Sequence, residues 1–329
     1  MIVILDGNSI AYRAYHKAPP LTADDGTPTG AVHVFFTILE RVRAKLKPSQ
    51  IIAVFDAEGP TVRHEMYAEY KANRDAMPED LAVQMKTINE LRPLAGNPVY
   101  RKSGIEADDI IATLAKKATE PVTIVTKDKD IFQLVDEKIK IYDDQTGKLL
   151  GADEAKIKYG VLPSQMLDFL SLLGDKSDNI PGVAGVGEKT AVKLIQEFGS
   201  LDGIYENIDT QKGKLKENLL RDKDNAYRAK ELIVLQEVEL FDPVNAPEYT
   251  KLRNRLSELG MRSVASKLLS SMGVDDPELV ETEEVLNLPV YNLGEVKTPT
   301  LCAAIDGSFW VTDEKNYESF DEAKHKLDK

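Results

Sequence analysis

Three short apolar runs, each followed by an aspartate, constrain the fold of this chain more than any other feature. The runs and their aspartates are residues 2–5 before Asp6, residues 50–55 before Asp56, and residues 121–126 before Asp128 and Asp130. Short apolar runs bounded by turn residues are typical of buried strands. Because helical patterns at 29–46 and 79–95 separate them, we predict an α/β fold over residues 1–150, with a mostly parallel sheet flanked by helices. An alternating run at 139–142 is expected at the sheet edge.

A second acidic feature lies between the predicted strands, at residues 103–111. Glu106, Asp108 and Asp109 place three carboxylates within four residues, at the predicted start of a helix. The helix dipole alone favours acidic side chains there, so the stretch by itself has a purely structural explanation. Its combination with the strand-end aspartates is more informative, because open α/β sheets place their sites at the carboxyl ends of the strands.

The acids at these positions, with two more in a later glycine-rich region, form one candidate site. They are Asp6, Asp56, Glu106, Asp108, Asp109, Asp128, Asp130, Asp175 and Asp178. Buried together without counter-ions, so many like charges would be strongly destabilising. Mg²⁺ or Mn²⁺ resolves the conflict, and two such ions about 3.5–4 Å apart suit phosphodiester hydrolysis. An aspartyl-phosphate phosphatase is disfavoured, because Asn8 stands where that chemistry needs a second aspartate.

A segment rich in bases and aromatics follows the second predicted strand, at residues 60–77. If it is one helix, a single face carries Arg63, Tyr67, Tyr70, Lys71 and Arg74. Such a face suits backbone phosphates and stacked nucleobases. A solvated helix is the alternative, since acidic residues are interspersed among the bases.

The glycine-rich stretch at 181–191 nearly matches a nucleoside-triphosphate loop. Glu188 intrudes before Lys189, and no buried strand precedes the stretch, so ATP binding is excluded. A glycine-rich turn between two helices can instead expose backbone N–H groups to a phosphate.

Composition limits the class of protein. The 329 residues contain one cysteine, Cys302, which excludes a disulfide framework and a cysteine-based zinc site and fits a reducing cytoplasm. No apolar run approaches the roughly 18 residues of a membrane span, so we expect a soluble protein with no membrane partner. The net charge of −13 is concentrated in residues 275–329, which carry fourteen acids and five bases. The acidity therefore does not exclude a phosphate-bearing partner.

The rest of the chain divides by pattern. Residues 151–272 read as an all-helical region, and residues 273–299 as an acidic linker. Residues 300–329 read as a small tail, with a hairpin around Asp306-Gly307 and a short helix at 318–327.

Several sequence blocks carry a family resemblance. They are Leu5-Asp6-Gly7-Asn8-Ser9, Val54-Phe55-Asp56-Ala57, Arg63-His64-Glu65, Tyr70-Lys71-Ala72-Asn73-Arg74, Gly104-Ile105-Glu106-Ala107-Asp108-Asp109, Asp128-Lys129-Asp130, Gly174-Asp175-Lys176-Ser177-Asp178-Asn179, and Ile180-Pro181-Gly182-Val183 through Glu188-Lys189-Thr190-Ala191. In order and spacing over residues 1–272, the chain resembles the 5′ nuclease domain of bacterial DNA polymerase I and its relatives, the flap endonuclease and 5′→3′ exonuclease family.

The resemblance implies a role for each candidate residue. Asp6, Asp56, Glu106 and Asp108 would hold the metal nearer the attacking water. The other five acids, Asp109, Asp128, Asp130, Asp175 and Asp178, would hold or tune the second metal. Residues 60–80 would form a helical arch over a 5′ single strand, from which Lys71 and Arg74 reach the scissile phosphate.

The resemblance also implies the DNA contacts. A helix–hairpin–helix at 181–191 would grip the duplex backbone, and the DNA-binding residues would be Arg63, Tyr70, Gly182, Gly185, Gly187, Lys189 and Thr190. A monovalent cation, commonly K⁺, would bridge this hairpin to phosphate. Its backbone carbonyls would come from Leu172, Leu173, Pro181, Val183 and Val186.

The resulting hypothesis is a Mg²⁺-dependent 5′→3′ exonuclease and 5′-flap endonuclease that leaves 5′-phosphates and acts in replication and repair. We expect a monomer whose partners are flapped, nicked or overhanging DNA, RNA–DNA primers, and a DNA polymerase in cis or in trans. The alternatives are an inactive structure-specific DNA-binding module and a ribonuclease of the related acid-cluster fold. The resemblance leaves open whether the chain is a fragment of a polymerase or a stand-alone nuclease with an extra tail.

Overall fold

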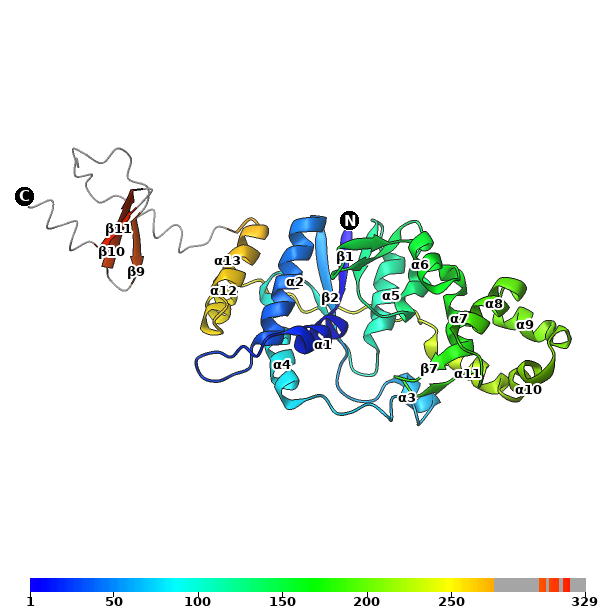
Figure 1. Ribbon diagram of the computed structural model, residues 1–329. Coiled ribbons are helices and arrows are strands. Elements are labelled where there is room, and N and C mark those ends of the chain that lie inside the picture. Colours follow the sequence, from blue (N-terminus) through cyan, green and yellow to red (C-terminus); the bar gives the residue numbers. More distant parts are fainter. Residues whose placement is uncertain (275–301, 306–307, 314–315, 320–329) are drawn as a thin grey trace, which may run out of the picture. The chain divides into compact units, whose positions relative to one another are not determined.

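The computed structural model describes residues 1–274 and three strand segments, at 302–305, 308–313 and 316–319 (Figure 1). The chain forms two compact units, Met1–Val274 and Asp275–Lys329.

In the second unit, the described segments are β9 (Cys302–Ile305), β10 (Ser308–Asp313) and β11 (Asn316–Ser319). They pair antiparallel in sequence order, which confirms the predicted hairpin around residues 306–307. The helix predicted from residue 318 is wrong at its start, since β11 is a strand paired with β10. The rest of that helix, and residues 275–299 of the predicted linker, lie outside the described residues.

The main sheet of the first unit has the order β3-β2-β1-β4-β5-β6 within the described residues. Its strands are β1 (Ile2–Asp6), β2 (Gln50–Val54), β3 (Val99–Tyr100), β4 (Val122–Val125), β5 (Ile139–Asp143) and β6 (Lys148–Leu150). All neighbours are parallel except β5 and β6, which confirms a mostly parallel sheet. The predicted edge position of β5 is wrong, because β6 covers it. The strands β3 and β6, of two and three residues, are too short to carry a sequence pattern that predicts them.

Strand register explains why the aspartates gather at one end of the sheet. Asp6 pairs with Val54 on β2, and Leu5 pairs with Val125 on β4. The residues that follow β1, β2 and β4 therefore leave the sheet side by side, as the parallel arrangement requires.

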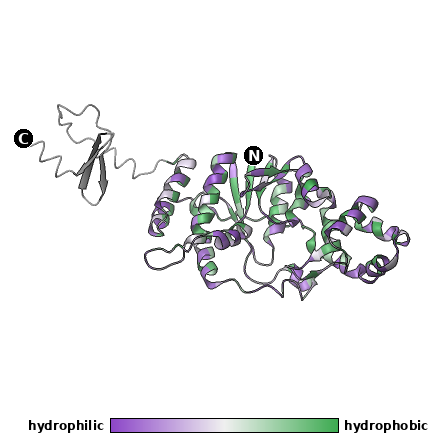
Figure 2. Ribbon diagram, in the orientation of Figure 1, coloured by the Kyte–Doolittle hydropathy of each residue, from purple (hydrophilic) through white to green (hydrophobic). Residues whose placement is uncertain are grey.

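Two hydrophobic cores cover the two faces of the sheet. Ile4, Ile52 and Ile124 pack into one core with α5 (Ala107–Lys117), whereas their neighbours along the strands pack into the other with α2 (Gly30–Leu46). This alternation is the period of two expected of strands buried on both faces. Figure 1 shows α2 and α5 on opposite sides of β1 and β2, and Figure 2 shows the hydrophobic colour along the strands and the facing sides of the helices.

The other helices extend both sides of this sandwich. Their bounds are α1 (Gly7–Lys17), α3 (Val62–Met66), α4 (Glu79–Leu94), α6 (Ala152–Tyr159), α7 (Met166–Leu173), α8 (Glu188–Phe198), α9 (Leu201–Glu206), α10 (Gly213–Arg221), α11 (Lys223–Ile233), α12 (Tyr249–Glu258) and α13 (Arg262–Ser271), with short 3₁₀ turns at Asp130–Leu134, Pro163–Gln165 and Ile208–Thr210. The α13 helix packs on α2 and the α12 helix on α4, far from α7–α11 (Figure 1). Within the described residues, no helix is long and apolar enough to cross a membrane.

Two local predictions are corrected by the structure. The region after residue 150 is not wholly helical, because β7 (Gly174–Asp175) and β8 (Ile180–Pro181) form a small antiparallel hairpin. The segment 60–77 is not one helix, since α3 ends at Met66 and turns follow. Lys71 lies in the left-handed region with φ of 57°, and its N–H donates to the carbonyl of Asp178 at 2.9 Å. Contacts with a distant loop therefore shape this segment more than local helix propensity.

Candidate active site

A pocket of about 530 Å³ lies at the carboxyl ends of β1, β2 and β4. Within the described residues, its wall includes eight of the nine predicted acids: Asp6, Asp56, Glu106, Asp108, Asp128, Asp130, Asp175 and Asp178. Lys71, Arg74 and Tyr70 from the segment after α3 line the same pocket. Residues from the sheet and the hairpin region thus meet in one acidic cavity, with bases at its rim.

Two of the strand-end aspartates accept hydrogen bonds from backbone N–H groups at the start of a helix, which is α1 for Asp6 and α5 for Asp56. Asp6 is the N-cap of α1, and its two carboxylate oxygens accept from the Ser9 N–H at 3.0 Å and the Thr126 hydroxyl at 2.6 Å. Asp56 accepts from the Ala107 N–H in the first turn of α5 at 2.8 Å. Free N–H groups at a helix start favour such a carboxylate, so each side chain is oriented before any ligand binds.

Burial and mutual repulsion shift the pKa values of this cluster. Burial raises the pKa of Asp6 to about 6, against the hydrogen bonds from Thr126 and Ser9. The pKa values of Asp108 and Asp130 lie well above the usual range, because burial and then the charge of Asp128 oppose ionisation. Within the described residues, the buried Oδ1 of Asp130 has no hydrogen-bond partner. The cluster therefore lacks positive charge at its centre.

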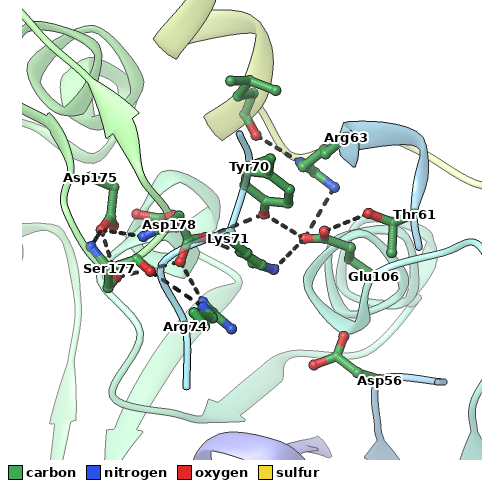
Figure 3. Close-up of polar contacts among 12 residues, drawn as sticks. Asp56, Thr61, Arg63, Tyr70, Lys71, Arg74, Glu106, Asp175, Ser177 and Asp178 are labelled. Carbon is green, nitrogen blue, oxygen red and sulfur yellow. Dashed lines mark hydrogen bonds and ion pairs between the residues drawn. The ribbon is translucent and has the colours of Figure 1, made fainter. Parts of the chain in front are cut away.

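Side-chain cations satisfy the other part of the cluster, as Figure 3 shows for Lys71 and Arg74. Lys71 Nζ lies 3.2 Å from Glu106 Oε2, and Arg74 pairs with Asp178. Lys129 Nζ pairs with Asp175 at 3.0 Å. The Tyr70 hydroxyl donates to Glu106 at 3.0 Å. The predicted arch residues thus lie directly on the acids, neutralising them through ion pairs.

These residues fit divalent cations. The donors are carboxylate oxygens, which Mg²⁺ and Mn²⁺ prefer, and the unpaired oxygen of Asp130 is directed to no protein donor in the described chain. No three acidic, histidine or cysteine side chains in the described residues already surround one metal position. The ion pairs of Glu106, Asp175 and Asp178 with basic side chains give a physical reason, and ligation would require these pairs to open.

Asp109 and Arg63 bind each other. Asp109 is buried outside the pocket wall that its neighbour Asp108 lines, and both its oxygens bind Arg63. Arg63 is 5% exposed and also donates to the carbonyls of Leu232 and Val234. The metal-ligand role of Asp109 and the DNA-contact role of Arg63 stay predictions; Arg63 also lines the pocket, with Nη1 3.5 Å from Glu106 Oε2. Because their polar atoms are satisfied inside the protein, the pair ties the arch base to the core.

The predicted hairpin connects α7 to α8 through β7, β8 and a turn at 183–187. Gly182 lies so close to β7 that a Cβ atom would come within 2.3 Å of the Leu173 carbonyl carbon. Gly187 is the N-cap residue of α8, and its neighbours Lys189 and Thr190 lie in the first turn, partly or fully exposed. This places backbone N–H groups and a lysine on the outer surface, as the prediction of a phosphate contact requires.

The five carbonyls predicted to hold K⁺ are only partly free. The Leu172 carbonyl accepts from the Val183 N–H at 2.8 Å, and the Val183 carbonyl accepts from the Val186 N–H at 3.1 Å. Each carbonyl has a second lone pair, so a cation remains compatible with these bonds.

Two residues that sequence reasoning missed hold the hairpin turn. Asn218 Nδ2 donates to the Ala184 carbonyl at 2.7 Å, and the Ala184 N–H donates to Asp222 at 2.8 Å. A Cβ on Gly185, whose φ is 77°, would lie 2.9 Å from Asn218 Nδ2. No local signal marks these two residues, because they are more than thirty positions away in the sequence. Lys129 was also missed, although it stands between two predicted ligands.

Comparison with known proteins decides the family. Residues 1–160 match the N-terminal resolvase-like domain of the 5′-3′ exonucleases, and residues 161–254 match their C-terminal SAM fold. The chain is 35% identical over 273 residues to the 5′-3′ exonuclease of Aquifex aeolicus, covering 81% of this chain and 94% of that protein. The chain belongs to the 5′-3′ exonuclease family.

This exonuclease-family chain also resembles part of a larger enzyme. It is 48% identical over 212 residues to DNA polymerase I of Pseudomonas aeruginosa, covering 63% of this chain and 23% of the polymerase. The chain therefore spans about a quarter of the length of that polymerase, whereas it matches nearly all of the Aquifex protein. Among solved structures, a bacteriophage T5 flap endonuclease complex with DNA and metal ions has a TM-score of 0.61 at 21% identity, covering 83% of this chain and 98% of that one. That likeness shows a shared fold.

Proposed function

We propose that this exonuclease-family chain is a Mg²⁺-dependent 5′ nuclease that hydrolyses DNA phosphodiesters near single-strand/duplex junctions and leaves 5′-phosphates. The observation that carries the proposal is the single pocket in which eight acids meet Lys71 and Arg74. An all-carboxylate cavity with bases at its rim matches the needs of metal-assisted phosphodiester hydrolysis. The T5 relative in fold, a flap endonuclease solved with DNA and metal ions, supports the same substrate class.

The acids around Asp6 and Asp108 would hold one divalent ion, and those around Asp128 and Asp175 a second. Bound there, the ions would supply an activated water and stabilise the leaving oxygen. The chain's own part is to orient these acids, which the Asp6 contact with α1 and the Asp56 contact with α5 already do. Mn²⁺ would substitute for Mg²⁺, since it prefers the same ligands.

Lys71 and Arg74 would bind the scissile phosphate. Both now pair with carboxylates of the pocket, so an entering phosphate would exchange one anionic partner for another. Positive groups directed at developing phosphate charge stabilise the transition state more than the ground state. Tyr70 is 3% exposed, and its hydroxyl donates to Glu106. This buried side chain would anchor the segment that carries Lys71 and Arg74.

The hairpin at 181–191 would hold the duplex by its backbone without reading its sequence. Exposed Gly185, Gly187 and Lys189 would meet phosphates, and K⁺ bound by the neighbouring carbonyls would bridge to one of them. Because the hairpin would bind the duplex while the pocket binds the scissile phosphate, the two sites together would fix how far from the bound duplex the strand is cut.

The biological setting follows from the relatives. We propose primer and flap removal in replication and repair, on DNA or RNA–DNA primers, by a monomer that acts with a DNA polymerase in cis or in trans. The likeness to a segment of DNA polymerase I supports this setting. A cytoplasmic location fits the single cysteine in 329 residues.

Cleavage of a 5′-flap duplex, labelled separately at each end, tests the proposal. We expect cuts close to the junction in Mg²⁺ or Mn²⁺, no cuts in EDTA, and 5′-phosphate ends that a ligase can join. Binding without cleavage in either metal would make the protein a DNA-binding module. Stronger cleavage of a matched RNA flap than of the DNA flap would instead support a ribonuclease.

A further inference from the structure

Arg92, in the last turn of α4, carries a buried positive charge without a counter-charge. The residue is 0% exposed, and none of its three guanidinium nitrogens has a hydrogen-bond partner in the described residues. The guanidinium group lies over the face of the Phe35 ring, with 5.5 Å between the guanidinium carbon and the ring centroid. A cation–π contact covers one face of a guanidinium and leaves the N–H groups at its edge unbonded.

A second arginine lies beside it. Arg43, in the last turn of α2, donates from Nη2 to Asn97 Oδ1 at 3.0 Å, while its buried Nε has no partner in the described residues. Asn97 is 1% exposed and follows the end of α4 by three positions. Burial, and then the charge of Arg43, lowers the pKa of Arg92 to about 9. Arg92 therefore stays charged at neutral pH.

No acidic side chain in the described part of the chain forms an ion pair with either arginine. A buried charge without a partner is among the most destabilising arrangements in a protein, and two like charges together make it worse. The described side chains therefore supply no counter-charge to either arginine.

We propose that a small inorganic anion binds between the guanidinium groups of Arg92 and Arg43, at the point where the ends of α2 and α4 meet. The recognition chemistry is the planar fork of N–H donors on each arginine, which suits halide and oxyanion ligands alike. Because Arg92 is fully buried, the site takes a single ion of chloride or phosphate size and no organic ligand. The residues of the acidic pocket take no part in it.

The start of α12 lies close to Arg43. Tyr249, at the start of α12, lies close enough to Arg43 to affect its charge, and its hydroxyl stands 3.1 Å from the position of a Cβ on Gly96. Tyr249 also lines an open pocket of about 700 Å³ between α4 and α12. Arg43 and Arg92 stand on α2 and α4, so an anion held by both guanidinium groups would join these two helices.

Thermal unfolding at constant ionic strength tests the proposal with wild type, Arg92→Leu, Arg43→Leu and the control Arg41→Leu. Arg41 is an exposed arginine on the same helix as Arg43, so the control loses the same charge without the site. Gluconate is replaced stepwise by chloride in one series and by phosphate in another. We expect a saturable rise of about 2–4 °C in wild type and control, and none in the two site variants. The series with the lower half-saturation concentration identifies the preferred anion.

The opposite results would overturn the site. An equal rise in wild type and both site variants would show a general salt effect, and no rise in any protein would show that nothing binds. Arg92→Leu unfolding above wild type at saturating anion would show an uncompensated charge that is better removed. If Arg92→Leu does not fold, Arg43→Leu carries the comparison. Wild-type crystals grown in bromide should show an anomalous peak at hydrogen-bond distance from both guanidiniums, and a flat map there would also reject the proposal.

Discussion

The guanidinium of Arg63 and the carboxylate of Asp109 form a two-point ion pair, with Nη1 to Oδ2 at 2.6 Å and Nη2 to Oδ1 at 2.9 Å. Both residues are 5% exposed. Asp109 also accepts from the Gln236 N–H at 2.9 Å, so the pair joins α3, α5 and the segment that follows α11. The base of the arch is thereby fixed to the sheet domain, while the turns beyond it reach the acidic pocket.

Removing one partner of this pair should be costly for stability. We expect Asp109→Asn or Arg63→Leu to lower the free energy of unfolding by about 3–5 kcal/mol, because the remaining charge stays buried after losing its two-point partner. Glu237→Gln is the control, since Glu237 pairs with Lys116 of the same helix at an exposed site and should cost less than about 1 kcal/mol. Urea unfolding measures both. An Asp109→Asn variant as stable as the control, with weakened Mg²⁺ binding, would support the predicted metal-ligand role instead.

The acid cluster should make the metal-free protein less stable as pH rises. The pKa values of Asp6, Asp108 and Asp130 are raised by burial, so the folded state holds protons that the unfolded state releases. Stability from this source is present below about pH 4 and is lost as pH rises through 6, and Asp6 alone contributes on the order of 3 kcal/mol.

Unfolding in urea between pH 4.5 and 8, in EDTA and in Mg²⁺, measures this effect. Mg²⁺ should remove most of the fall in the free energy of unfolding with rising pH, because the cation binds the ionised carboxylates. Asp6→Asn should flatten the EDTA curve. A wild-type curve in EDTA that rises through this range would contradict the prediction.

Asp128→Asn should weaken binding of the second metal ion without unfolding the protein. Asp128 lies between Asp6, Asp108 and Asp130 and its burial raises its pKa, so a neutral side chain relieves repulsion. We expect thermal stability in EDTA equal to or above wild type, a smaller stabilisation by Mg²⁺ than in wild type, and cleavage reduced by at least about 10²-fold. Full cleavage in Mg²⁺ by Asp128→Asn or Asp6→Ala would reject the proposed mechanism.

Lys71→Ala should slow cleavage far more than it weakens binding. Its ammonium group lies 3.2 Å from Glu106, inside the pocket, where it can follow the charge on a phosphate as that charge develops. We expect a single-turnover rate lower by about 10²–10³-fold and a Kd for flap DNA within about threefold of wild type. Lys86→Ala, an exposed lysine on α4, is the control. Equal losses in rate and binding would show that the arch only docks DNA.

Asn218→Ala and Asp222→Ala should weaken duplex binding and leave the chemical step unchanged. Each removes one of the two side-chain hydrogen bonds that hold the Ala184 peptide in the hairpin turn. The loss of one such bond predicts a Kd for blunt duplex about 3- to 10-fold higher. Asn254→Ala on α12 is the control. Variants that bind duplex like the control would show that the turn keeps its shape without α10.

Local sequence patterns were sufficient to predict much of this fold and of the candidate site. Apolar runs specify β1, β2 and β4, and a parallel sheet must then bring Asp6, Asp56 and Asp128 to one edge. The glycines at 182 and 185 likewise allow the turn to be predicted from sequence, because their backbone positions exclude or strain a side chain. In each case the physical requirement acts between near neighbours or through strand pairing, and both leave a periodic trace in the sequence.

Tertiary contacts decided the rest. Asp108 and Asp109 are adjacent in one helical turn, yet successive residues on a helix point in different directions, so one faces the pocket and the other faces Arg63. The predicted arch helix ends at Met66, because Asp178 and Asn179 bind the backbone of the following turns. Asn218 and Asp222 meet Ala184 only after α10 packs beside the hairpin. Sequence by itself determined which groups could react; packing between distant segments determined which of them face the pocket, since side-chain direction depends on neighbours that no local pattern encodes.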